Sequence, residues 1–182
     1  MSKIIISGSH STGKTTLVNE LKKAFPIMKI LPETARKVIT KINILPIEAE
    51  KDINKKLILQ REILKNQIGI EQKNKEVSYI GDRGIFDPLA YCFDLKKKDR
   101  DEMLDTGLKH YLQNPYSHIF FLLPVLEVED DGTRILDKNF QLKISKEIEN
   151  LYRKFKVKYI KIKTISLEER ISLVKKIIEK DE

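Results

Sequence analysis

The sequence predicts a single α/β domain built around a parallel sheet, and two patterns lead to that prediction. Short apolar runs alternate with segments of helical periodicity over the whole of the 182 residues, which is typical of a parallel sheet covered by helices. One run, His118 to Leu123, is almost wholly apolar, as expected for a strand with helices on both faces. No repeat, linker or low-complexity tract interrupts the pattern, so residues 1–182 are interpreted as one domain.

Each predicted strand is a short apolar run, and each predicted helix has apolar residues three and four positions apart. A helix should follow the first strand, with Leu17, Val18 and Leu21 on its buried face. The last helix should open at Ser166, which forms a capping box with Glu169. In chain order we expect strands at 3–7, 27–31, 77–80, 118–123 and 159–162, and further helices at 33–40, 47–74, 86–95, 100–112 and before the last strand.

Composition limits the function classes without choosing one. The net charge of +8 favours anionic ligands, which include both nucleotides and nucleic acids. The single cysteine, Cys92, excludes a disulfide within the chain. No apolar run is long enough to span a membrane, and the first residues read as a strand and not as a signal peptide. We therefore expect a cytoplasmic protein with no membrane association.

A phosphate-binding loop is the strongest local signal. Residues 8–15 read Gly-Ser-His-Ser-Thr-Gly-Lys-Thr, which fits the Walker A pattern G-x-x-x-x-G-K-[ST] between a predicted strand and a predicted helix. In this pattern the backbone N–H groups and the helix N-terminus surround phosphates, and the lysine reaches the β- and γ-phosphate oxygens. We expect ATP to contact nine residues: Gly8, Ser9, His10, Ser11, Thr12, Gly13, Lys14, Thr15 and Thr16.

Two carboxylates follow predicted strands at the edge of the sheet where ligands of α/β proteins bind. Glu33 follows the second strand and Asp82 follows the third. Phosphoryl transfer requires a metal ion and a carboxylate that orients or deprotonates the nucleophile. We expect Thr15 and Asp82 to hold Mg²⁺ and Glu33 to contact the acceptor. Which of the two carboxylates is the base stays open.

Three arginines and one glutamine complete the candidate site. Arg83, beside Asp82, is a candidate catalytic and substrate residue, and Arg36 and Gln60 are candidate substrate residues. The acidic loop at about 124–138 is the place for a lid that excludes water, and its Arg134 would stabilise charge on the γ-phosphate. Asp87, which precedes a proline, is interpreted as a helix cap.

Nearly the whole chain resembles the P-loop AAA-type ATPases and kinases that include the ribosylnicotinamide kinase domain of bifunctional NAD-biosynthesis proteins. The segment Asp82-Arg83 also resembles thymidylate kinases, whose arginine lies at the phosphate-transfer site. The residues that carry the first resemblance are the loop at 8–15, Glu33-x-x-Arg36, Asp130-Asp131-Gly132-x-Arg134 and Leu167-Glu-Glu-Arg170. The resemblance implies a five-stranded parallel sheet, ATP with Mg²⁺, and a nucleoside- or nucleotide-like acceptor. Ribosylnicotinamide kinases carry Asp-Thr-Asp where this chain has Gly81-Asp82-Arg83, so the acceptor itself is left open.

Three functions remain open at this stage. The first is a phosphotransferase that moves the γ-phosphate of ATP to a nucleoside- or nucleotide-like small molecule. The second, suggested by the charge, is a polynucleotide 5′-hydroxyl kinase, although no aromatic and basic residues interleave as single-strand binding requires. The third is a switch ATPase with a protein partner. The oligomeric state is not indicated by the sequence.

Overall fold

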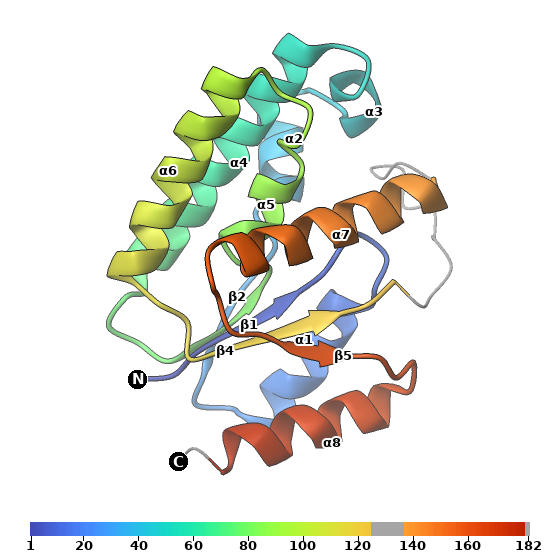
Figure 1. The fold of residues 1–182 in the computed structure, drawn as a ribbon. Coiled ribbons are helices and arrows are strands. Elements are labelled where there is room, and N and C mark those ends of the chain that lie inside the picture. The colour runs from blue at the N-terminus through green and yellow to red at the C-terminus, as the bar shows by residue number, and fades with distance from the viewer. Residues whose placement is uncertain (125–136, 181–182) are drawn as a thin grey trace.

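A parallel sheet of five strands forms the centre of the computed structural model, which describes residues 1–124 and 137–180 (Figure 1). The strand order is β2-β3-β1-β4-β5. Because β3 and β4 pair with the two sides of β1, the loop after β1 opens at the middle of the carboxyl edge, where the strand order reverses. The strands are β1 (Lys3–Ser7), β2 (Lys29–Leu31), β3 (Tyr79–Asp82), β4 (His118–Leu122) and β5 (Ile160–Ile162).

The helices lie in two layers that bury opposite faces of the sheet (Figure 1). One layer packs against a face that includes Ile4 and Ile6, and the other packs against a face that includes Ile5. This alternation within β1 is the period of two of a strand covered on both sides. The first layer is α1 (Lys14–Ala24) and α8 (Leu167–Ile178); on the other side of the sheet lie α2 (Ala35–Ile42), α3 (Pro46–Ala49), α4 (Ile53–Lys73), α5 (Phe86–Ala90), α6 (Lys97–Gln113) and α7 (Lys138–Lys154).

The long helix predicted for residues 47–74 is wrong in its first part. The chain forms the short α3, turns at residues 50–52, and begins α4 at Ile53. Asp52 causes the new start, because its carboxylate accepts hydrogen bonds from the backbone N–H groups of Asn54 (2.9 Å) and Lys55 (3.3 Å). The break matters for the site because residues of both α3 and α4 line one pocket.

Four strands differ from their predicted bounds, and β4 and β5 do so by a single residue at one end. β2 begins two residues late, and Ile27 is almost fully exposed. β3 begins and ends two residues later than predicted, so that Asp82 pairs in register with Ile6 of β1 and is held by the sheet.

In α8, Arg170 is buried beside Val174 and Ile178. Within the described ranges, no helix combines the length and apolarity that crossing a membrane would require.

Tyr79 provides a test of the packing under β3. Its side chain is 1% exposed, and its hydroxyl forms no hydrogen bond with any atom of the described residues. Burial and then the charge of Glu71 raise the pKa of Tyr79 well above its usual range. A buried polar group without a partner costs about 1–3 kcal/mol. We therefore expect Tyr79→Phe to raise the free energy of unfolding by about 1 kcal/mol in urea titrations. A decrease would show that the hydroxyl is bound, for example by an ordered water.

Candidate phosphate-binding and acceptor site

The loop between β1 and α1 has the backbone conformation that a phosphate cradle requires. Gly8 and Gly13 have φ angles of 146° and 81°, and Ser11 has a φ of 54°. A Cβ atom on Gly8 would lie 2.7 Å from the carbonyl oxygen of Leu122, so a side chain has no room there. Gly13 is the N-cap of α1, and the helix therefore directs its N-terminus at the loop. These features position backbone N–H groups for anion binding.

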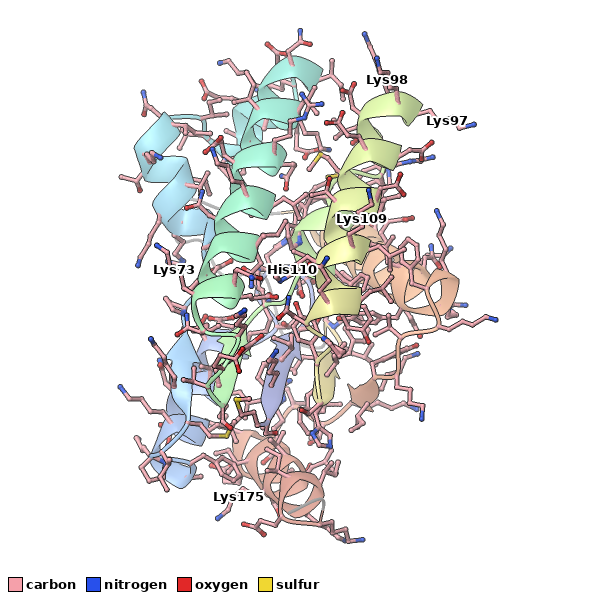
Figure 2. All side chains as sticks on the ribbon, turned by 90° about the vertical axis from the view of Figure 1, so that its left-hand side faces the viewer. Lys73, Lys97, Lys98, Lys109, His110 and Lys175 are labelled. Carbon is pink, nitrogen blue, oxygen red and sulfur yellow. The ribbon has the colours of Figure 1, made fainter. Side chains whose placement is uncertain are left out.

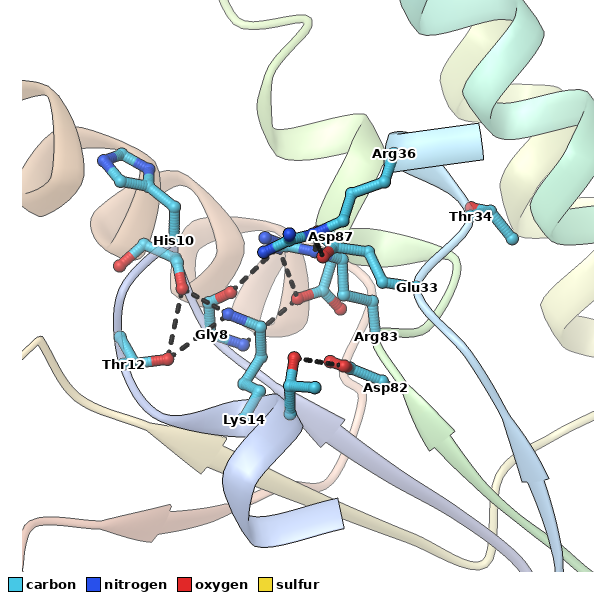
Figure 3. Close-up of polar contacts among 12 residues, drawn as sticks. Gly8, His10, Thr12, Lys14, Glu33, Thr34, Arg36, Asp82, Arg83 and Asp87 are labelled. Atoms are coloured by element: carbon cyan, nitrogen blue, oxygen red, sulfur yellow. Dashed lines mark hydrogen bonds and ion pairs between the residues drawn. The ribbon is translucent and has the colours of Figure 1, made fainter. Parts of the chain in front are cut away.

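Lys14 lies within this loop and is 5% exposed (Figure 3). Its ammonium group donates to the carbonyl oxygen of Ser9 and, over 3.3 Å, to the hydroxyl of Thr12. Burial, and after it the charge of Arg83, lowers the pKa of Lys14 to about 7. An anion bound in the loop would stabilise the charged form of Lys14. It would replace the hydration that burial removes and offset the repulsion from Arg83.

Thr15 and Asp82, the two candidate Mg²⁺ ligands, lie in contact. The Thr15 hydroxyl donates to Asp82 Oδ2 over 2.6 Å. Asp82 Oδ1 is buried, and no atom of the described residues forms a hydrogen bond with it. Burial raises the pKa of Asp82, although the charge of Lys14 and the hydrogen bond from Thr15 oppose that effect. A hydroxyl and a carboxylate with a free oxygen form the donor set that Mg²⁺ takes beside nucleotide phosphates, so these two residues fit the ion.

Glu33 and Arg83 form an ion pair across the loops that follow β2 and β3 (Figure 3). Arg83 Nε lies 2.7 Å from Glu33 Oε1, and Arg36 Nε lies 3.4 Å from Glu33 Oε2. Burial raises the pKa of Glu33, but the charges of Arg83 and Lys14 outweigh it and hold this pKa at about 2. Arg83 also donates to the carbonyl oxygen of Gly8 over 3.1 Å. Glu33 is therefore ionised at every physiological pH and lies beside the phosphate loop.

Asp87 is a site residue that the sequence interpretation missed. It does not cap α5, whose N-cap is Ile85, and it is 1% exposed. Its carboxylate accepts from the Ser7 hydroxyl (3.1 Å), Gly8 N (3.1 Å) and Gly84 N (3.0 Å), and so ties the phosphate loop to the loop after β3. The available signal was its closeness in sequence to Arg83, whose guanidinium lies 3.7 Å from Asp87 Oδ1 across the turn between β3 and α5.

An open pocket lies beside these residues on the α2–α5 side of the sheet. Its cavity volume is about 100 Å³, below the range of about 300–1,000 Å³ typical of small-molecule sites, and the space at its mouth is open to solvent. The pocket brings together the four predicted substrate residues, Glu33, Arg36, Gln60 and Arg83. Gln60 is 5% exposed, and its Oε1 has no hydrogen-bond partner among the described residues.

Other pocket residues carry no local signal in the sequence. Tyr91, the C-cap of α5, and Phe140 of α7 add aromatic surface, and their ring centroids lie 6.1 Å apart. His10 lies on this side as well, with its ring 6.0 Å from that of Phe140 and its Nδ1 3.4 Å from the Tyr91 hydroxyl. Thr16 is exposed at the start of α1. Arg134 and the predicted lid, apart from its first and last residues, lie outside the described residues.

Comparison with known families identifies the class of protein. The AAA domain family matches residues 3–170. The chain therefore belongs to the AAA domain family, and the predicted resemblance to P-loop kinases and ATPases is confirmed at this level. No curated protein matches the sequence.

Solved structures of P-loop kinases share the fold over almost the whole chain. A structure of NadR protein in complex with NR has 20% identity and a TM-score of 0.78, and the match covers 96% of this chain and 51% of NadR. The chain thus spans about half the length of NadR. Deoxyadenosine kinase from M. mycoides with bound dATP has 17% identity and a TM-score of 0.71, with 98% and 100% covered. Thymidylate kinase from Candida albicans has 15% identity and a TM-score of 0.70, with 99% and 92% covered.

Proposed function

We propose that this protein is an ATP-dependent phosphotransferase that moves the γ-phosphate to a nucleoside- or nucleotide-like small molecule. The observation that carries the proposal is the pocket beside the phosphate loop. In it, an ionised carboxylate, Glu33, lies next to the cation Arg83, and the buried amide oxygen of Gln60 has no partner among the described residues. A hydrolase that uses only water has no need of such a pocket. The related folds of NadR, deoxyadenosine kinase and thymidylate kinase support the same class of acceptor.

Each residue of the site would have a separate role in the reaction. Lys14 and the loop N–H groups would bind the β- and γ-phosphates, and Thr15 and Asp82 would hold Mg²⁺, which neutralises charge on these oxygens when bound. Glu33 accepts a hydrogen bond from the acceptor hydroxyl, whose oxygen attacks the γ-phosphorus as the bond to the β,γ-bridging oxygen breaks and ADP leaves. With a pKa of about 2, Glu33 orients the hydroxyl and takes its proton only late in the transfer.

Three further residues of the pocket, Gln60, Tyr91 and Phe140, would recognise the acceptor. Gln60 can accept from an amino or ring N–H group of a base, because its buried Oε1 has no hydrogen bond within the described chain. Tyr91 and Phe140 supply apolar faces of the kind that pack on a planar ring. Arg134, in the acidic loop, is proposed to approach the γ-phosphate from the lid.

The test is turnover of ATP against a panel of acceptors: nucleosides, nucleoside monophosphates, nicotinamide riboside and 5′-hydroxyl oligonucleotides. We expect labelled phosphate on one class of small acceptor and little ADP without it. The same ADP release in every reaction, with no labelled acceptor, would refute the proposal and favour a switch ATPase. Label on the oligonucleotides alone, with retention that falls steeply with salt, would indicate a polynucleotide kinase.

A further inference from the structure

A buried glutamine on α4 contacts both loops that carry the proposed reaction. Gln67 is 2% exposed, and its Oε1 accepts a hydrogen bond of 3.0 Å from the hydroxyl of Thr34, the residue after Glu33. Its Nε2 donates to the carbonyl oxygen of Arg83 over 3.4 Å. One amide group therefore bridges the loop after β2 and the loop after β3, within the wall of the pocket.

The orientation of this amide is set by a carboxylate one helical turn along α4. Gln67 Nε2 donates to Glu71 Oε1 over 2.8 Å, and Glu71 is 1% exposed. The same oxygen accepts from the Tyr116 hydroxyl (2.8 Å), and Glu71 Oε2 lies 2.8 Å from His110 Nε2. Figure 2 looks onto α4 and α6, with His110 between the two helices. Because a carboxylate only accepts, the Gln67 amide must turn its nitrogen to Glu71 and its oxygen to Thr34.

The same cluster holds the loop after β3 at a second point. The Tyr116 hydroxyl accepts a hydrogen bond of 2.8 Å from the backbone N–H of Ile85. This loop needs support, because Arg83 has a φ of 83°, a left-handed conformation that is strained for a residue with a side chain. Its side chain must nevertheless meet Glu33 at 2.7 Å and the phosphate loop at Gly8.

We propose that Gln67, oriented by Glu71, is a positioning residue that holds Glu33 and Arg83 in the geometry required for phosphoryl transfer. The proposal rests on the function proposed above. Gln67 acts through Thr34 and through the Arg83 backbone, without touching the reacting atoms. A displacement of about 1 Å in catalytic groups reduces rates by as much as about 100-fold, so the loss of both bonds should appear in kcat.

Gln67→Met removes the two hydrogen bonds to the loops, and with them the bond to Glu71, at nearly constant volume. We expect kcat to fall between about 10- and 100-fold, with the KM for ATP within about twofold of its original value. Tyr79→Phe is the matched control, because it changes another buried group near Glu71 that bonds to neither loop, and it should leave kcat unchanged. Retention of kcat by Gln67→Met would overturn the proposal. So would a loss confined to the acceptor KM, which would make Gln67 a substrate contact. If Gln67→Met does not fold, Thr34→Val serves as the second variant. It removes the hydroxyl that donates to Gln67 Oε1 and should also lower kcat.

Gln67→Glu supplies a conservative rescue that a merely structural role would not produce. Two adjacent carboxylates, at positions 67 and 71, share a proton at low pH. The protonated side chain donates to Glu71 and accepts from Thr34, whereas the ionised one repels Glu71. Among the described residues, the titratable or charged groups around the pair include His110, Tyr116 and Tyr79 near position 71 and Arg83 beside position 67. We expect the kcat of Gln67→Glu, relative to the unmodified protein, to rise as the pH falls from 8 to 6. A ratio that is flat with pH would contradict the proposal.

Amide hydrogen exchange separates this proposal from the proposed function, since it needs no acceptor. In Gln67→Met we expect faster exchange at residues 33–36 and 83–85 and unchanged exchange in β1 and β4. Unchanged exchange in both loops would overturn the positioning role whatever the activity. Faster exchange in these loops supports the role even if the unmodified protein phosphorylates no acceptor of the panel, in which case the proposed function alone fails.

Discussion

Lys14→Ala should lower kcat/KM for ATP on the order of 10³-fold without lowering the stability of the fold. The loss arises because Lys14 is the only cation of the phosphate loop itself, residues 8–15, and its ammonium group lies against the carbonyl of Ser9 inside the loop. Steady-state kinetics measures the loss. Lys22→Ala, which removes an exposed lysine of the same helix, is the control and should have no effect. Turnover at the original rate in Lys14→Ala would refute the assignment of the phosphate site.

The stability of Lys14→Ala should depend on pH in a defined direction. The pKa of Lys14 is about 7 in the folded protein and about 10.5 in the unfolded chain. Below pH 7 both states are protonated, and the folded state bears the full cost of a buried charge. Between pH 7 and 10.5 the unfolded state binds the additional proton, so the unmodified protein gains stability as the pH rises. The stability of Lys14→Ala relative to the unmodified protein should therefore be greater at pH 6 than at pH 9, as urea titrations at both values would show.

The same group couples nucleotide binding to proton uptake. Phosphate oxygens beside Lys14 favour its charged form and raise its pKa above 7. ATP affinity should then be constant below pH 7 and fall above it. Calorimetry at pH 8 in buffers of different ionisation enthalpy measures the protons taken up. Equal apparent enthalpies in these buffers would contradict the coupling.

The candidate site residues that lie together in the structure as the sequence predicts are those whose signal is local or follows from the sheet. The phosphate loop is contiguous, and its glycines, lysine and threonine have fixed spacings. The meeting of Glu33 with the loop after β3 follows from parallel strands, because their carboxyl ends lie at one edge. The helix start at Asp52 also had a local signal, an aspartate before an apolar residue, which the longer apolar periodicity concealed.

The parts that sequence did not reveal depend on tertiary contacts between distant segments. Gln67 and Tyr116 are ordinary polar residues of a helix and a loop until Glu71 brings them together, 49 positions apart along the chain. Tyr91 at the end of α5 and Phe140 of α7 likewise line one pocket. The periodicity of a sequence does not indicate which distant residues come together, because the packing of the helices on the sheet determines those contacts. The predicted bounds of β3 were wrong for a related reason. The strand extends to Asp82 because its residues pair with β1, and apolarity alone does not indicate that pairing.

Glu33→Gln should lower kcat by about 10²–10⁴-fold, because an amide accepts the acceptor hydroxyl's hydrogen bond weakly and takes no proton from it. The change also removes the nearer ion-pair partner of Arg83, whose guanidinium is 11% exposed and lies 2.7 Å from Glu33 and 3.7 Å from Asp87. A largely buried cation that keeps only the more distant carboxylate reduces stability, and this effect accounts for part of the kinetic loss.

A double-mutant cycle with Arg83→Gln separates the two effects. If Glu33 acts on the acceptor, the double variant should recover stability relative to Glu33→Gln, because the buried guanidinium that lost its 2.7 Å partner is removed as well, and should remain as inactive. If Glu33 serves only to hold Arg83, then Arg83→Gln alone should be as inactive as the double variant, and Glu33→Gln should lose far less. A kcat of Glu33→Gln within about tenfold of the original would therefore reassign the carboxylate from the acceptor hydroxyl to the positioning of Arg83.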